Sequence, residues 1–148
     1  MKTVLDTTTS WLWFPSIAEY KNGELRLVLE EGQIQNKLQS VEVAPGAVIE
    51  NLSAIEIPLT SRRVEVHFTD VRLIQIYDEV AHKAHPAETR DSGIVAMHHN
   101  SELVRWLCES TKLMHIIPGE LFHYSVETAE DFYHVITREH PAVHEIDV

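Results

Sequence analysis

The sequence predicts a single α+β or mainly β domain over residues 1–148, with antiparallel sheets that form a sandwich or one strongly curved sheet. Short segments of alternating apolar and polar residues recur along the chain and are separated by turn residues. Only one segment, near residues 101–110, has apolar residues at helical spacing. No internal repeat or linker divides the chain, and its length suits one domain.

The clearest strand is expected at residues 23–32. Leu25, Leu27 and Leu29 alternate there with more polar positions, which indicates one buried face. Residues 71–80 are apolar at both parities, a pattern typical of a central strand that is covered on both faces. The other expected strands cover residues 38–46, 52–59, 62–68, 93–99, 121–128 and 131–138.

The one clear helix is expected at residues 101–110. Either Asn100 or Ser101 can cap its N-terminus, and Glu102 suits the first turn. Cys108 is the single cysteine, so no internal disulfide can form. It falls among apolar residues near the end of this helix, where we expect a small buried side chain rather than a reactive thiolate. The region from 81 to 93 loses periodicity and is expected to be a loop.

An aromatic cluster occupies the first twenty residues. Trp11 and Trp13 have the parity of one strand face, while Pro15 is expected to break any regular element. Because each ring can bury a large area, we expect core packing, with a ligand pocket as the alternative. The cluster consists of Trp11, Trp13, Phe14 and Tyr20.

The formal net charge is −11, from 12 basic and 23 acidic residues. This balance argues against nucleic-acid binding, which needs clustered lysine and arginine. We expect no membrane partner, because no apolar run approaches the roughly 20 residues needed to span a bilayer. The N-terminal segment has no signal-peptide pattern, so a cytoplasmic location is expected. An acidic surface suits a basic protein partner reached by electrostatic steering.

The chain has ten histidines, four of them between residues 121 and 144. His123 and His134 share one face of the predicted hairpin if its loop is Ala129–Glu130. A loop one residue longer moves His134 to the face of Tyr124, and the turn sequence leaves both registers open. Three closely spaced pairs match no known metal signature. These pairs are His82–His85, His98–His99 and His140–His144.

No catalytic motif is present in the sequence: there is no nucleophile elbow, no glycine-rich phosphate loop and no Cys-x-x-Cys. Asp78 and Glu79 are adjacent carboxylates at the end of a predicted strand, where solvated polar residues are common. We therefore assign no catalytic residue and no cofactor. If the protein does hold a metal, the candidate ligands are His98, His123 and His134.

From about residue 64 to 146, the order of features is VEVHFTDVRLIQIYDE, a variable loop, NSELVRWL, and FHYSVETAEDFYHVITREHPAV. This order resembles a widespread group of small uncharacterised bacterial proteins, some of which are similar to immunity proteins. The resemblance implies a binding role rather than an enzymatic one. It transfers no functional residue, because its shared motifs are structural.

The leading hypothesis is therefore a non-enzymatic cytosolic protein-binding module, immunity-like, with an acidic surface that meets a basic partner. The alternative is a small-molecule- or metal-binding enzyme with a histidine-lined pocket. A homo-oligomer that buries exposed aromatic residues is a third hypothesis. The carboxylates considered for the basic partner are Glu30, Glu31, Asp78 and Glu79.

Overall fold

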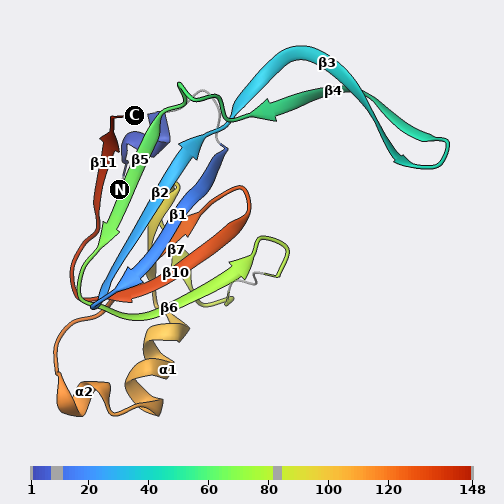
Figure 1. The fold of residues 1–148 in the computed structure, drawn as a ribbon. Coiled ribbons are helices and arrows are strands. Elements are labelled where there is room, and N and C mark those ends of the chain that lie inside the picture. Colours follow the sequence, from blue (N-terminus) through green and yellow to red (C-terminus); the bar gives the residue numbers. More distant parts are fainter. Residues whose placement is uncertain (1, 8–11, 82–84, 148) are drawn as a thin grey trace.

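The computed structural model describes residues 2–7, 12–81 and 85–147. Its strands form two antiparallel sheets that pack face to face, and a separate two-stranded arm extends from them (Figure 1). One clear helix covers the far side of the second sheet. The predicted fold class is confirmed. Trp11 and His82 lie outside the described residues.

The first sheet has four strands in the order β1-β2-β5-β11. Leu25, Leu27 and Leu29 of β2 all face the core, as their alternation predicted. The expectation that Pro15 breaks regular structure was wrong. A β-bulge between Pro15 and Ile17 lets an edge strand continue through the proline. The strands are β1 (Trp13–Lys21), β2 (Glu24–Glu31), β5 (Arg63–Phe68) and β11 (Ala142–Ile146), the last of which was not predicted.

The second sheet has five strands in the order β6-β10-β9-β8-β7. The prediction that residues 71–80 form a central strand was wrong, since β6 lies at the edge. Ile74 packs against the core, whereas Ile76 is 57% exposed. The predicted loop at 81–93 contains the two-residue strand β7. The strands are β6 (Val71–Asp78), β7 (Thr89–Arg90), β8 (Val95–His99), β9 (Phe122–Glu127) and β10 (Asp131–Thr137).

The core lies between the two sheets. Trp13 is fully buried and Phe14 half-buried, whereas Tyr20 is 57% exposed, so the N-terminal aromatic cluster is only partly core. The tilted rings of Phe68 and Tyr124 have centroids 6.0 Å apart. Both sheets and the N-terminal segment contribute fully buried apolar residues, among them Leu5, Leu27, Leu29, Val64, Val66, Phe68, Val95, Val126 and Val135.

Helix α1 (Glu102–Ser110) begins where the sequence predicted. The Ser101 hydroxyl is its N-cap and accepts a hydrogen bond from the Val104 amide at 3.1 Å. Cys108 on this helix is half-buried rather than fully buried. Two short elements were not predicted, the 3₁₀ helix η1 (Val4–Thr7) and α2 (Leu113–Ile116). Among the described residues, no helix has the length and apolar character to cross a membrane.

The arm consists of β3 (Gln33–Ala44) and β4 (Ala47–Glu56), joined at Pro45–Gly46. Both strands are longer than predicted and begin earlier in the chain. Among the strands that the structure describes, β3 and β4 pair only with each other, and they project from the sandwich (Figure 1).

Because two tyrosines are buried in the core, we expect the protein to lose stability at alkaline pH. Burial raises the pKa of Tyr124 and Tyr133 above the ordinary value of 10.0. Negative charge raises it further, from Asp91 for Tyr124 and from Asp131 and Glu130 for Tyr133. Because the folded protein holds these protons more tightly, their contribution is fully present below about pH 10 and is lost as the pH rises further. Urea unfolding at pH 8 to 11 should show this loss, and Tyr133→Phe should lose less than wild type. Equal losses would contradict the prediction.

Candidate metal centre

The outer face of the second sheet carries a row of polar side chains. Along β9, Tyr124 and Val126 face the core, so His123 and Ser125 point to the opposite face. In the β9–β10 hairpin, His134 lies opposite Ser125, which is the register given by a two-residue loop. This register is the first of the two that the sequence left open.

Three histidines from three neighbouring strands meet on this face. His98 of β8 lies directly opposite His123 of β9, and His134 of β10 is diagonal to His123, two residues from Ile136, which lies opposite His123. All three are buried, with exposed fractions of 8%, 3% and 4%. The His98 and His123 rings stack, with centroids 4.1 Å apart and planes 17° apart.

The nitrogen atoms of these rings are close enough to converge on one ion. One nitrogen from each ring lies within 4.8 Å of the others. His123 Nε2 and His134 Nδ1 are 2.8 Å apart and share a hydrogen bond. Two nitrogens bound to tetrahedral zinc at about 2.1 Å are about 3.4 Å apart, so modest ring rotations would complete such a site.

The second nitrogens of two of these rings are held by other groups. His98 Nδ1 bonds to Glu88 Oε1, and because a carboxylate only accepts, Nδ1 carries the hydrogen. The other oxygen of Glu88 accepts the amide of Glu102 at the start of α1, at 3.1 Å. His123 Nδ1 lies 2.7 Å from the Ser101 hydroxyl. Metal-binding histidines are commonly oriented by partners of this kind.

His98 is held in its neutral form. Burial lowers its pKa below the ordinary value of 6.5, and this effect outweighs the opposing influence of Glu88. With the hydrogen on Nδ1, Nε2 is an acceptor, and the Ser125 hydroxyl donates to it at 2.8 Å. Arg90 Nε in turn donates to the Ser125 hydroxyl at 2.8 Å. A neutral imidazole is the form that binds metals.

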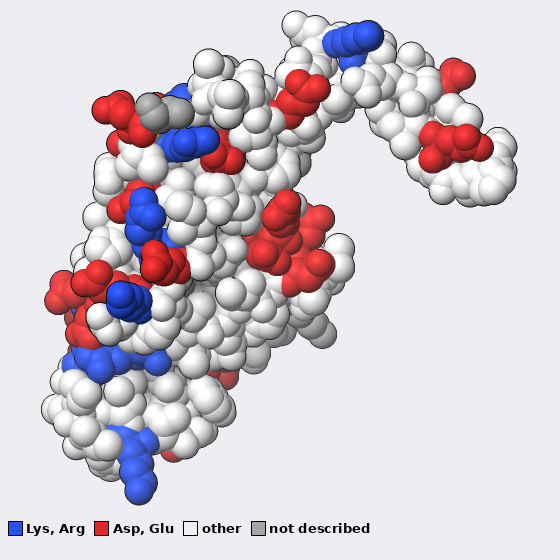
Figure 2. All heavy atoms as spheres, in the orientation of Figure 1, with Lys and Arg blue, Asp and Glu red and all other residues white. Residues whose placement is uncertain are grey.

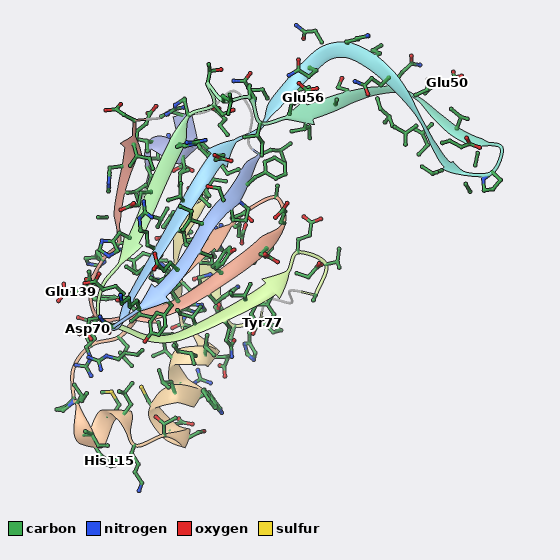
Figure 3. All side chains as sticks on the ribbon, viewed as in Figure 1. Glu50, Glu56, Asp70, Tyr77, His115 and Glu139 are labelled. Atoms are coloured by element: carbon green, nitrogen blue, oxygen red, sulfur yellow. The ribbon has the colours of Figure 1, made fainter. Side chains whose placement is uncertain are left out.

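A pocket of about 520 Å³ opens above two of the three rings. His123 and His134 line it, whereas His98 is not among its described lining residues. The loop before β8, strand β6 and helix α1 form the walls, and Tyr77 lies on the side of β6 toward α1 (Figure 3). The lining residues are Gln75, Tyr77, Ala81, His85, Glu88, Glu102, Leu103, Trp106, His123 and His134.

Of the other histidines that the sequence singled out, His85 lies in the same pocket, whereas His99, His140 and His144 lie elsewhere. His99 points away from His98, as predicted for neighbours on a strand, and its Nε2 lies 2.9 Å from Asp91. His85 lines the pocket. His140 Nδ1 lies 2.5 Å from the Tyr124 hydroxyl, and His144 is exposed on β11.

The four carboxylates considered for a basic partner fall in two separate places. Glu30 forms an ion pair with Arg63, at 2.7 Å, and Glu31 lies 3.8 Å from Arg62 in the first sheet. Asp78 and Glu79 are exposed at the end of β6.

Asp78 lies opposite Asp131 at the start of β10. Figure 2 shows acidic side chains gathered where these two strands meet. The basic protein partner stays a prediction.

Sequence reasoning did not find four residues of the centre. Glu88 and Arg90 lie in a stretch predicted as loop, and Ser101 was identified only as a helix cap. Ser125 had one detectable feature, its parity with His123 in the hairpin. Comparisons with protein-family models, with curated proteins and with solved structures return no match.

Proposed function

We propose that this chain is a metal-dependent enzyme that acts on a small molecule bound in the pocket. The observation that carries the proposal is the convergence of His98, His123 and His134, buried and with ring nitrogens within 4.8 Å of one another, beside a pocket that His123 and His134 line. Glu88 and Ser101 hold the Nδ1 atoms of two of the rings, so a bound ion would take the place of the hydrogen bonds that His98 Nε2 makes with Ser125 and His123 Nε2 makes with His134.

The donor set favours a transition metal. Imidazole nitrogens suit zinc, copper, iron and nickel, whereas magnesium and calcium prefer oxygen ligands. A site with three protein ligands keeps coordination positions open, as catalytic sites do and closed structural sites do not. Those positions would face the pocket, because His123 and His134 line it.

The pocket suits a small organic molecule. Its volume of about 520 Å³ lies within the usual range for ligand sites. The side chains of Trp106, Leu103 and Tyr77 give the pocket walls an aromatic and apolar surface. The described lining residues include no lysine or arginine. A neutral or cationic molecule would therefore fit these walls better than a phosphate ester.

Metal content is the direct test. Untagged protein, purified without a metal-affinity column, should carry or take up one transition-metal ion per chain in native mass spectrometry and elemental analysis. His123→Ala and His134→Ala should each weaken binding by more than the roughly 10- to 100-fold that loss of an orienting partner costs. Glu88→Gln should fall within that range. Added metal should raise the melting temperature of wild type but not of His123→Ala.

His99→Ala is the matched control. This histidine neighbours His98 on the same strand but is exposed on the other face, so its loss should leave metal binding unchanged. Circular dichroism would show that each variant folds. Failure of folded wild type to bind any transition metal, or retention of metal after His98, His123 and His134 are all replaced, would overturn the proposal.

A further inference from the structure

The arm carries apolar side chains that the described part of its own chain leaves about half exposed. Its large apolar residues are each between 37% and 60% exposed. Ile34 lies opposite Ile55 and Val41 opposite Ile49, so each pair shares one face of the hairpin. The exposed apolar residues are Ile34, Leu38, Val41, Val43, Val48, Ile49, Leu52 and Ile55.

Such a hairpin is at best marginally stable by itself in water. Two strands without a third or a covering layer are marginal, and exposed apolar surface of this extent marks an interaction site. Figure 2 shows few charged side chains along the arm. The charged residues of its two strands are Lys37, Glu42, Glu50 and Glu56.

Packing at its base sets the direction in which the arm leaves the sandwich. A Cβ at Gly32 would lie 2.6 Å from Phe14 Cε2 and 2.9 Å from Ile55 Cγ2, so a side chain there would clash. The Gly32 amide also donates to the Leu12 carbonyl at 2.9 Å. The absence of a side chain therefore lets the base of the arm pack closely against β1.

We propose that the arm packs on a second copy of this chain, along the free edges of its strands β1 and β6, and that the exchange is reciprocal. These strands are the outermost of their sheets. Both lie on one side of the sandwich (Figure 1). Tyr20 of β1 and Leu73 and Ile74 of β6 line one shallow pocket there, together with Val71 and Arg72. Ile17, Tyr20 and Ile76 expose apolar surface on these edges.

The surface area that would be buried favours reciprocal exchange over contact between the two arms alone. At about 3.3 Å per residue and 4.8 Å between strands, the arm is about 40 Å long and 10 Å wide, or about 400 Å² per face. Two arms that meet only each other would bury about 800 Å² in total, which is below a stable interface. Two arms that each cover the partner's edge would bury about 1,600 Å², the size of a standard interface.

The proposal is tested by the mass of the untagged full chain in solution. Analytical ultracentrifugation from low to about 100 µM should show a dimer, since a standard-size interface is populated at that concentration. Val41→Asp combined with Ile49→Asp should weaken association by about 100-fold or more, because each copy then buries charges at two places. Tyr20→Asp, which alters the receiving edge, should weaken it as well.

Leu59→Asp is the control. Leu59 is 84% exposed but lies outside both the arm and the two edges, so its replacement should leave the dimer intact. Circular dichroism and melting temperature would confirm that every variant folds. A monomeric wild type at 100 µM overturns the proposal, as does a dimer that the arm variant leaves unchanged. A dimer lost in the arm variant but kept in Tyr20→Asp overturns the assignment of the receiving edge.

Discussion

Replacement of Trp13 by alanine should lower the free energy of unfolding by about 3–5 kcal/mol. Trp13 is fully buried between the sheets, so its removal leaves the largest cavity that a single truncation can make in this core. Its Nε1 also donates to the Leu5 carbonyl at 3.1 Å, and the Arg62 guanidinium lies 5.9 Å from the ring centroid. Urea denaturation at neutral pH measures the change.

Trp106→Ala is the matched control for this prediction. Trp106 is 50% exposed on α1, so its replacement by alanine should lower the free energy of unfolding by about 1 kcal/mol or less, because much of its surface already meets water. The decrease for Trp13→Phe should lie between those of the two alanine variants, since phenylalanine keeps most of the packing but loses the hydrogen bond to Leu5. Equal effects of Trp13→Ala and Trp106→Ala would contradict the assignment of Trp13 to the core.

The first sheet shows how far local patterns predict this fold. Leu25, Leu27 and Leu29 alternate along β2, and all three are buried. The same holds for β5, where Val64 and Val66 are fully buried. Buried positions on the core face recur every second residue, so these strands could be predicted without knowledge of the strand order, although Val28 on the other face of β2 is buried as well.

The predictions for Pro15 and for β6 were wrong because the position of a strand in its sheet overrides the pattern of the local sequence. Pro15 lies inside β1 because an edge strand has a free side and a bulge relieves the distortion. β6 was predicted as central because it is apolar at both parities, yet Ile76 faces solvent at a sheet edge. On the proposed dimer, that exposed edge is covered by the partner's arm, which no local pattern encodes.

The sequence analysis identified His98, His123 and His134 as candidate metal ligands, but it could not predict that they lie together. Whether His123 and His134 share a face depends on the loop length of one hairpin, and two lengths fitted the sequence. The contact with His98 depends on β8 pairing with β9, across a segment that contains α1 and α2. Glu88 had no periodic pattern at all, because a loop side chain reaches the rings through tertiary packing.

Arg90 joins the loop before β8 to the centre of the second sheet. Its guanidinium donates to the Ser125 hydroxyl at 2.8 Å and to the Gly93 carbonyl at 2.7 Å, and it lies 3.1 Å from Glu127. Burial lowers the pKa of Arg90, while Glu127, Asp6 and Asp91 oppose that effect. The Arg90 side chain therefore serves as hydrogen-bond donor or charge partner to three groups, the Ser125 hydroxyl, the Gly93 carbonyl and the Glu127 carboxylate.

Arg90→Ala should lower the free energy of unfolding by about 2 kcal/mol, because it removes the donor from the buried Ser125 hydroxyl and the Gly93 carbonyl and the charge partner of Glu127, which is 30% exposed. Arg90→Lys should recover only part of this loss, since an ammonium group cannot reproduce the planar fork. Arg105→Ala is the control. Its pair with Glu102 on helix α1 is 54% exposed on the arginine side and 32% on the glutamate side, and such surface pairs contribute about 0–1 kcal/mol. Urea denaturation of the three variants would show the order, and an Arg90→Ala loss no larger than that of Arg105→Ala would mean that solvent replaces the guanidinium at no cost.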